Sequence, residues 1–297
     1  MLAISLLWMS TVLWPTGITR TWTYLPALQA SAFCAAVSAV FAIGLFRSVL
    51  RAFVFALIAV LAIVVVPRIP APFIPDATAD SVRVFALNTY FGAADDQAIA
   101  QRVAELKPDV VVLSETNPKE VDAVASKTNM VATGPVEPGV GGADAVAILI
   151  REGAPMNGAG DQGLTRFQNP MVTRPAKDEQ STPLDIMGVH FVAPVGDDRV
   201  AWDSELETTV NWVNEKKAAG NSQLILAGDF NATRLHPRFR DLQLEDCTGH
   251  MAHTPTWPAV LPLLRLDHIL TTGTCHGAGQ VGVEGTDHKG VWADISA

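Results

Sequence analysis

Residues 223–231 read QLILAGDFN, an uncharged apolar run followed by Asp229 and Asn231. Residues 223–227 have the length and the Leu/Ile content of a buried β-strand. Such a strand would carry Asp229 and Asn231 at its carboxyl end. Ligand sites in α/β proteins collect at the carboxyl ends of strands. The stretch therefore predicts an α/β fold with chemically active side chains at one edge of a sheet.

Three more polar side chains stand where an apolar run ends. Asn88 ends the run FALN, Glu115 ends DVVVLSE and His190 ends LDIMGVH. Each residue alone is more simply explained as a turn or capping residue. Four such residues, counting Asp229, are hard to explain as independent accidents, and strand ends on one edge converge in space. We therefore expect the four side chains to form one site.

Strand-like and helix-like segments alternate along residues 81–297, with no internal repeat. Two helices are expected, one capped by Asp95 or Asp96 and ending at Leu106, and one beginning at Asp197 or Asp198 and ending at Ala219. Apolar runs predict strands at 82–87, 109–114, 145–150, 184–189, 223–227, 266–270 and 290–295. Residues 134–143 and 153–163 are rich in Gly and Pro and are expected to be loops.

Two Asp-His pairs follow the apolar strands, in RLDHIL (Asp267) and GTDHKGVWADI (Asp287-His288). With the strand-end residues, their order and spacing resemble the endonuclease/exonuclease/phosphatase superfamily. Its members include DNase I-like nucleases, sphingomyelinases and inositol-polyphosphate phosphatases. The resemblance covers residues 81–297, and its most specific motifs are Gly-Asp-Phe-Asn and the last Asp-His. Thr286 stands where the family usually has Ser, and both residues carry a hydroxyl.

The resemblance implies a four-layer α/β sandwich, in which two packed mixed β-sheets are flanked by helices. It also implies a hydrolase that acts on phosphate esters with Mg²⁺ or Mn²⁺ as cofactor. Asn88, Glu115 and Asp287 would hold the metal, and oxygen ligands of this kind suit a hard cation. Neutralising the phosphoryl oxygens is the main electrostatic task of such a site.

Five residues take catalytic roles by the same resemblance. Asp229 would orient or deprotonate the attacking water, and Asn231 would donate to the phosphoryl group. His288 would contact the phosphate, oriented by Asp267 as a carboxylate orients a catalytic imidazole. His190 would be a phosphate contact or a general acid.

The first 75 residues differ sharply from the rest in charge. They contain four basic residues and no acid, whereas residues 76–297 contain all thirty acids and seventeen basic residues. Residues 25–46 and 49–66 are apolar runs long enough to cross a bilayer, and residues 2–19 are a weaker third candidate. We expect a transmembrane region at 1–66 with two to three helices, a Pro-rich linker at 67–80 and a catalytic domain at 81–297.

Arg47 and Arg51 lie between the last two expected spans, and the positive-inside tendency places them in the cytoplasm. The catalytic domain would then be extracytoplasmic on a multi-pass protein of the cell membrane. Cys34 falls within a span, which leaves Cys247 and Cys275 in the domain. The sequence allows either a disulfide in an oxidising compartment or two buried thiols.

The substrate is inferred from charge and from the apolar head. An acidic domain is poorly suited to gripping polynucleotides, because that affinity comes largely from Lys and Arg. The apolar head before this domain resembles a bacterial membrane-anchored group that includes the teicoplanin-resistance protein VanJ. We therefore expect the partners to be the lipid membrane and a phosphorylated lipid or small phosphoester. A secreted-side nuclease is the alternative, and an inactive lipid- or partner-binding domain is a remote third possibility.

Overall fold

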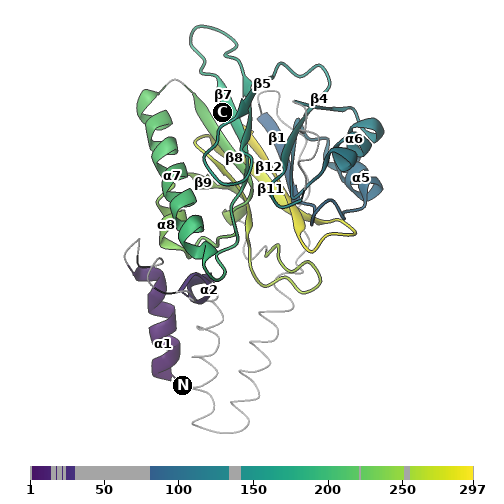
Figure 1. Cartoon of the computed structure of the whole chain (residues 1–297). Helices are drawn as coiled ribbons and strands as arrows, with labels where there is room; N and C mark the ends of the chain where they lie inside the picture. The colour runs from purple at the N-terminus through teal and green to yellow at the C-terminus, as the bar shows by residue number, and fades with distance from the viewer. Residues whose placement is uncertain are drawn as a thin grey trace.

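The structure is a computed structural model that describes residues 2–14, 18, 22, 25–30, 81–133, 142–220, 222–250 and 255–296. Residues 81–296 contain two six-stranded mixed β-sheets that pack face to face, with helices on their outer faces (Figure 1). Sheet A has the order β11-β12-β1-β2-β4-β3, and sheet B has the order β5-β6-β7-β8-β10-β9. This layering agrees with the α/β sandwich expected from the sequence.

The strands of the two sheets have the following bounds. Sheet A consists of β1 (Ser81–Asn88), β2 (Val110–Ser114), β3 (Met130–Ala132), β4 (Val146–Arg151), β11 (Thr274–Gly282) and β12 (Lys289–Ser296). Sheet B consists of β5 (Asn157–Asp161), β6 (Pro170–Arg174), β7 (Leu184–His190), β8 (Gln223–Asp229), β9 (Glu245–Asp246) and β10 (Asp267–Thr271). The central pairs β1/β2 and β7/β8 are parallel, and the neighbouring pairs around them are antiparallel.

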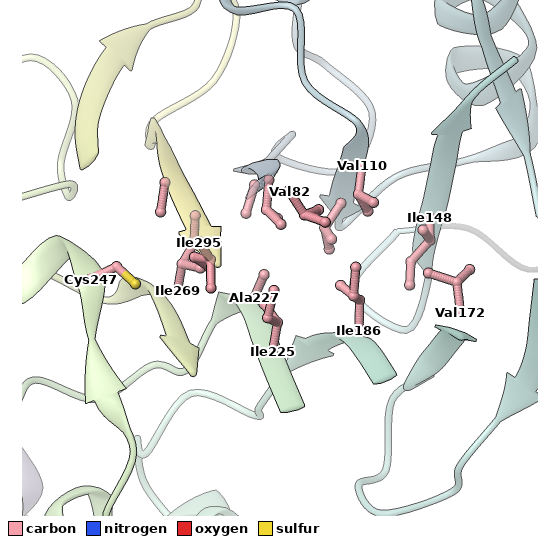
Figure 2. Close-up of a cluster of buried hydrophobic side chains, with 14 of the residues drawn as sticks. Val82, Val110, Ile148, Val172, Ile186, Ile225, Ala227, Cys247, Ile269 and Ile295 are labelled. Carbon is pink, nitrogen blue, oxygen red and sulfur yellow. The ribbon is translucent and has the colours of Figure 1, made fainter. Parts of the chain in front are cut away.

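The core between the sheets is built by the period-2 alternation of the central strands. Val82, Val84 and Ala86 of β1 share this core with Ile225 and Ala227 of β8. Figure 2 shows Val82 on one side of the core and Ile225 and Ala227 on the other. A Cβ at Gly188 of β7 would lie 3.0 Å from Val146 and 3.1 Å from Val112, so glycine allows close approach of the sheets. Deleting a large side chain from such a core costs about 2–5 kcal/mol.

The alternate side chains face outward and are covered by helices. Phe85 and Leu87 of β1 pack against the apolar face of α5 (Asp96–Leu106), which includes Ile99 and Val103. Helix α6 (Pro118–Lys127) covers the same face of sheet A. On sheet B, α7 (Asp198–Ala219) contributes Trp202, and the short α8 (Pro237–Arg240) follows β8. These two outer clusters complete the four layers.

A buried ion pair joins β1 to β12. Arg83 and Asp294 face each other in the register of the two strands. Arg83 Nε donates to Asp294 Oδ1 at 2.6 Å, and Nη2 donates to Oδ2 at 2.8 Å. Both side chains are buried, and the guanidinium also donates to the Leu106 carbonyl. A two-pronged, charge-assisted pair of this kind fixes the register of the strands.

One expectation from the sequence is wrong. Residues 153–163 were expected to be a loop, but Asn157–Asp161 form strand β5 at the edge of sheet B. All five residues of β5 are exposed, and its pairing with β6 is shifted between Gly158 and Gly160. An edge strand needs only backbone hydrogen bonds to one neighbour, so it leaves no apolar alternation in the sequence.

The described N-terminal residues form α1 (Leu2–Ser10), the 3₁₀ turn η1 (Thr11–Leu13) and α2 (Leu25–Ala30). Trp8 Nε1 donates to the Leu28 carbonyl at 2.7 Å, and Gln29 Nε2 donates to the Thr11 carbonyl at 3.1 Å. Among the residues that the structure describes, no helix has both the length and the apolar character needed to span a membrane. The expected span at 49–66, most of that at 25–46 and the linker at 67–80 lie outside the described residues.

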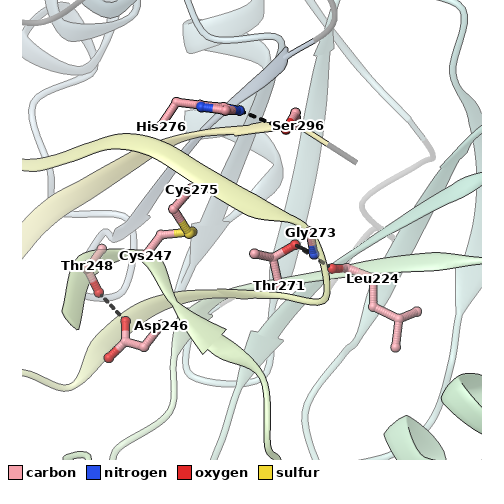
Figure 3. Close-up of a disulfide and its surroundings, with 9 residues drawn as sticks. All are labelled: Leu224, Asp246, Cys247, Thr248, Thr271, Gly273, Cys275, His276 and Ser296. Atoms are coloured by element: carbon pink, nitrogen blue, oxygen red, sulfur yellow. Dashed lines mark hydrogen bonds between the residues drawn. A yellow bond between two sulfur atoms is a disulfide. The ribbon is translucent and has the colours of Figure 1, made fainter. Parts of the chain in front are cut away.

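Cys247 and Cys275 are joined by a disulfide, with 5.4 Å between the two Cα atoms (Figure 3). Cys247 begins the 3₁₀ helix η4 (Cys247–His250), directly after β9 of sheet B, and Cys275 belongs to β11 of sheet A. The bond therefore cross-links the two sheets. It resolves the choice that the sequence left open between a disulfide and two thiols.

Reducing this disulfide is expected to lower the free energy of unfolding by about 3–4 kcal/mol, because a closed chain segment of this length restricts the unfolded state. Thermal unfolding of the full chain in detergent, with and without reductant, measures the effect. A Cys34→Ser variant should show the same difference as the native chain. Equal unfolding temperatures with and without reductant would contradict the prediction.

Candidate active site

Four polar side chains meet at one edge of the two sheets. Parallel pairing places Asn88 of β1 beside Ser114, the last residue of β2, and Glu115 follows at once. In sheet B, the same geometry places His190 of β7 beside Asp229 of β8. The carboxyl ends of both parallel pairs therefore lie together, as the sequence predicted for these four residues.

A hydrogen bond crosses from one sheet to the other at this edge. The Asn88 amide donates from Nδ2 to Glu115 Oε1 at 3.1 Å and to Asp229 Oδ2 at 3.0 Å. Asn88 and Asp229 are almost fully buried. An amide nitrogen has two hydrogens, so both donations can be made at once. Asn88 thus holds two carboxylates of opposite sheets at a fixed separation.

His190 completes this arrangement from sheet B. Its Nε2 lies 3.6 Å from Glu115 Oε1 and 3.9 Å from Asp229 Oδ2. Its Nδ1 lies 2.9 Å from the Ala143 carbonyl, and its ring stacks on Phe167 with 4.8 Å between centroids. Since a carbonyl can only accept, Nδ1 carries a hydrogen, and Nε2 is the atom presented to the carboxylates.

Asp267 and His288 form a second buried pair. The antiparallel register of β10 on β8 places Asp267 opposite Asp229. Asp267 Oδ2 lies 2.8 Å from His288 Nδ1, and His288 Nε2 lies 3.8 Å from Asp229 Oδ2. Burial lowers the pKa of His288, but the carboxylates of Asp267, Asp229 and Asp287 outweigh it and raise the pKa to about 10. His288 is therefore an imidazolium at neutral pH.

Two site residues have left-handed backbone conformations. The φ angles of Glu115 and Asn231 are +52° and +46°. Asn tolerates this region, whereas a residue such as Glu pays about 1–2 kcal/mol for it. Asn231 is held by two bonds, from its backbone N to Asp229 Oδ1 and from its Nδ2 to the Phe191 carbonyl, each 2.8 Å. Strain of this kind persists where the surrounding contacts fix a functional geometry.

Gly228 of the Gly-Asp-Phe-Asn motif is required by close packing of β8 on β7. Its φ angle is +142°, and a Cβ at this position would lie 2.0 Å from the Val189 carbonyl oxygen. No side chain fits such a distance. The glycine therefore allows β8 to deliver Asp229 next to His190.

The segment Thr286-Asp287-His288 contacts both β1 and Trp257. Thr286 Oγ1 donates to the Asn88 carbonyl at 2.7 Å and accepts from the His288 backbone N at 3.1 Å. Asp287 Oδ2 accepts from Trp257 Nε1 at 2.9 Å. The hydroxyl at position 286 thus positions Asp287 and His288 relative to Asn88.

The oxygen atoms of the site fit a divalent cation. Glu115 Oε2 and Asp287 Oδ1 are buried and have no hydrogen-bond partner. A buried carboxylate oxygen without a partner is costly, and a hard cation such as Mg²⁺ would satisfy it. Asp229, Asp267 and His288 also bring three ligand atoms within 4.8 Å of one another. His288 is protonated and engaged with Asp267, and Asn88 turns its Nδ2 toward the carboxylates while its Oδ1 accepts from Tyr90 N. We therefore consider the carboxylate oxygens of Glu115 and Asp287 the better ligands.

These groups form the polar part of a cavity of about 410 Å³. Its polar lining includes Glu115, Asp229, Asn231, Asp287 and His288. The remaining lining is largely apolar and is contributed by Tyr90, Phe91, Ala193, Pro194, Val195, Trp257, Leu264 and Leu266. The cavity therefore combines a cluster of acids and an imidazolium with apolar walls.

A buried carboxylate supports the residues next to Asn88 and Glu115. Thr89 Oγ1 and Thr116 Oγ1 each lie 2.7 Å from Glu120 Oε2. Burial raises the pKa of Glu120, and the two hydroxyls partly offset that rise. Glu120, in the first turn of α6, thereby ties the chain after β1 to the chain after β2.

All eight residues predicted for the site lie in this cluster: Asn88, Glu115, His190, Asp229, Asn231, Asp267, Asp287 and His288. Sequence reasoning did not find Glu120, Phe167 or the Tyr90-Phe91 pair. Glu120 looks like an ordinary acid in the first turn of a helix. The aromatic residues carry no motif, and only the folded chain places them beside the site.

Comparison with known proteins agrees with this geometry. The Endonuclease/Exonuclease/phosphatase family matches residues 85–288, and all eight residues of the site lie within that range. None of the curated proteins matches the chain.

Three solved structures share the fold at low sequence identity. A D. rerio TDP2 complexed with single strand DNA product is 17% identical over 73% of this chain and 99% of its own, with a TM-score of 0.54. TDP2 from C. elegans is 14% identical over 94% and 93%, with a TM-score of 0.55. The mannosyl-6-phosphatase Bt3783 of Bacteroides thetaiotaomicron VPI-5482 is 15% identical over 72% and 99%, with a TM-score of 0.52.

Replacing Asp267 by Asn is expected to lower the pKa of His288, because the nearest negative charge that raises it is removed. NMR titration of the imidazole in the metal-free full chain measures the change. His288 should stay protonated at pH 8 in the native chain and lose its proton at lower pH in the variant. The NMR signals of Cys275-neighbouring His276, an exposed residue bonded to Ser296, serve as an internal control for the fold of the variant. A native His288 that titrates near 6.5 would contradict the prediction.

Replacing Glu120 by Ala is expected to lower the free energy of unfolding by about 2 kcal/mol, because two hydroxyls lose a buried acceptor. Glu120→Gln keeps an acceptor oxygen and should lose less. Asp122→Ala, an exposed carboxylate on the same helix, should change stability by no more than about 0.5 kcal/mol. Chemical denaturation of the three variants decides this, and equal stability of Glu120→Ala and Asp122→Ala would rule it out.

Proposed function

The chain belongs to the endonuclease/exonuclease/phosphatase family, and we propose that it is a membrane-anchored, divalent-metal-dependent hydrolase of phosphoesters or pyrophosphates. In this proposal the substrate is a phosphorylated lipid or another envelope phosphate, and the site works at the outer face of the cell membrane. The single observation that carries the proposal is the composition of the cavity. Acids, an imidazolium, Asn231 and His236 form the polar part of its lining, and apolar side chains form the rest.

The polar part fits the phosphate of such a substrate. Glu115 and Asp287 would hold Mg²⁺ or Mn²⁺, which when bound supplies positive charge to the phosphoryl oxygens. Asn88, expected from the sequence to be a third ligand, would take that role only with its amide oxygen turned toward the ion, because its Nδ2 faces Glu115 and Asp229 in the structure. Without a cation, four carboxylates in this cluster would repel a phosphate. The partnerless oxygens of Glu115 and Asp287 are the atoms best placed for that role.

The remaining residues supply the proton transfers and hydrogen bonds. Asp229 would accept the proton of the attacking water, because its carboxylate is fixed by Asn88 and faces the cavity. His288, held as an imidazolium by Asp267, would donate a hydrogen bond to a phosphoryl oxygen. His190 would contact the phosphate or protonate the leaving oxygen. One N–H of Asn231 is used by the Phe191 carbonyl, which leaves the other for the substrate.

The apolar walls favour a lipid over a polynucleotide. Ala193, Pro194 and Leu264 line the cavity beside the site, and such walls suit hydrocarbon. The surplus of acids in residues 76–297 disfavours a long polyanion. The same fold is shared by the mannosyl-6-phosphatase Bt3783 and by the D. rerio TDP2 complexed with single strand DNA product. A nuclease therefore remains the alternative within the same chemistry.

Membrane anchoring and orientation are supported by the sequence and by the disulfide. The uncharged runs at 25–46 and 49–66 have the length of membrane spans. Arg47 and Arg51 favour a cytoplasmic turn between them. The Cys247–Cys275 disulfide fits an oxidising compartment. Tethering beside the bilayer would raise the effective concentration of a lipid substrate, as in the VanJ-like group that the apolar head resembles.

The proposal predicts metal-dependent phosphate release from lipids by the purified full chain. In detergent micelles with Mg²⁺ or Mn²⁺, a polyprenyl pyrophosphate and a lipid phosphate should be hydrolysed, and plasmid DNA should be cut slowly or not at all. Chelation should abolish release, and added metal should restore it. Glu115→Ala and Asp229→Asn should each lower the rate by about 10²–10⁴-fold.

Two outcomes would contradict the proposal. Rapid nicking of DNA without release from any lipid would establish the nuclease alternative. Lipid-phosphate turnover that survives both substitutions would show that this cluster is not the catalytic centre. Asp122→Ala, which changes an exposed acid outside the cavity lining, is the matched control for both variants.

A further inference from the structure

Large apolar side chains are exposed around the mouth of the cavity. Val260 is 94% exposed, Val195 67% and Phe91 56%. Tyr90, Trp257 and Leu261 are exposed beside them. Scattered exposed apolar residues are ordinary, but a group of them around one site marks a surface for a partner or a membrane. These six residues are called the apolar rim below.

One part of the rim is a closed, uncharged loop. Residues 257–264 read WPAVLPLL, with prolines at positions 258 and 262. The backbones of Trp257 and Leu264 exchange hydrogen bonds of 2.9 Å in both directions, which closes the loop. Ala259 N donates to the Asp287 carbonyl at 2.6 Å. The loop is therefore attached to a residue of the site, and it holds Val260 and Leu261 outward.

The other part of the rim follows β1. Tyr90 and Phe91 both have left-handed backbones, with φ angles of +53° and +58°. Tyr90 N donates to Asn88 Oδ1 at 3.0 Å, and the two rings contact edge to face at 5.4 Å. Aromatic residues rarely adopt this conformation, so the strain must be maintained by the contacts around it. It presents two aromatic rings at the mouth instead of burying them.

The position of the N-terminal helices indicates what covers the rim. α1 and α2 lie at the end of the molecule toward which β8 runs, which is the end that carries the site (Figure 1). α1 has no charged residue, and Ile4, Leu6 and Leu7 on it are exposed. Two exposed apolar surfaces at one end of the molecule, with the apolar runs 25–46 and 49–66 following α1 in sequence, point to a single apolar environment.

We propose that the apolar rim is a membrane-docking surface that seats the mouth of the cavity on the lipid headgroups, with Val260 and Leu261 in the acyl-chain boundary. This inference rests on the proposed lipid-phosphate hydrolysis and adds the route of the substrate. Aromatic and aliphatic side chains without charge are the residues that enter such an interface. A docked mouth receives a lipid phosphate directly from the bilayer and excludes long polymers in water.

Spin labelling tests docking without relying on activity. The full chain, in a Cys34→Ser background, is labelled at Val260→Cys and reconstituted into phospholipid nanodiscs. The control label is at Glu179→Cys, an exposed position in the β6–β7 loop, at the end of the sheet opposite the site. The label at 260 should be reached by oxygen and protected from a water-soluble nickel complex, and the label at 179 should show the reverse. Equal access of the nickel complex to both positions would overturn the proposal.

A charge in the rim tests the consequence for turnover. Val260→Asp should lower hydrolysis of a lipid phosphate in nanodiscs roughly tenfold. Val131→Asp changes an equally apolar, exposed valine that pairs with Ile150, far from the site, and should leave that rate at the native level. Hydrolysis of a water-soluble phosphoester by each variant shows whether the catalytic centre is intact. Equal lipid rates for the two variants would overturn docking, whereas a native chain inactive on every phosphoester would overturn the proposed function instead.

Concentration-dependent coupling between labels at 260 would also overturn docking, because it would show a second copy of the chain on the rim. Such coupling is absent if the rim faces lipid. The labelling experiment therefore separates the membrane from a protein partner.

Discussion

The site depends on two β-sheets meeting within hydrogen-bonding distance at one end of their interface. Asn88 of sheet A donates to Asp229 of sheet B. Glycines at positions 188 and 228 allow the close packing around this contact. Gly188 admits Val112 and Val146 across the interface, and Gly228 admits the neighbouring backbone within sheet B. Dense packing of this kind fixes the positions of the strands relative to one another, since protein interiors have little free volume. Asp229 and Asp267 are therefore placed by strands of the core, and Glu115 directly follows the end of another strand.

The same packing concentrates negative charge where water is largely excluded. Glu115, Asp229 and Asp287 line the cavity, and Asp267 lies buried behind His288. Such a cluster is tolerated because each acid has an assigned counterpart: the Asn88 amide, the Trp257 indole or the His288 imidazolium. A single imidazolium cannot balance four carboxylates. Glu115 Oε2 and Asp287 Oδ1 line the cavity without hydrogen-bond partners, and a divalent cation would take them.

The sequence predicted those features that leave a local pattern. Asn88, Glu115, His190 and Asp229 were found because each follows an apolar run, and parallel pairing then brings the ends together. Other features depend on contacts between distant segments. The antiparallel register that places Asp267 opposite Asp229 joins segments far apart in the sequence. Glu120 looks in the sequence like an ordinary acid in the first turn of a helix, because its contacts with Thr89 and Thr116 exist only in the folded chain. β5 escaped prediction because an exposed edge strand needs no apolar alternation.

The pairing of β1 with β12 has a consequence for the timing of assembly. β1 lies between β2 and β12 in sheet A, and the Arg83–Asp294 pair forms only when both strands are present. Thr286, Asp287 and His288 immediately precede β12 and reach Asn88 together with it. Contacts between such distant segments form late in folding, because their loop-closure entropy is large. A nascent chain that has not yet received β12 therefore lacks the Thr286 bond to Asn88 and the side chains of Asp287 and His288. The candidate site is incomplete until this last strand has been added.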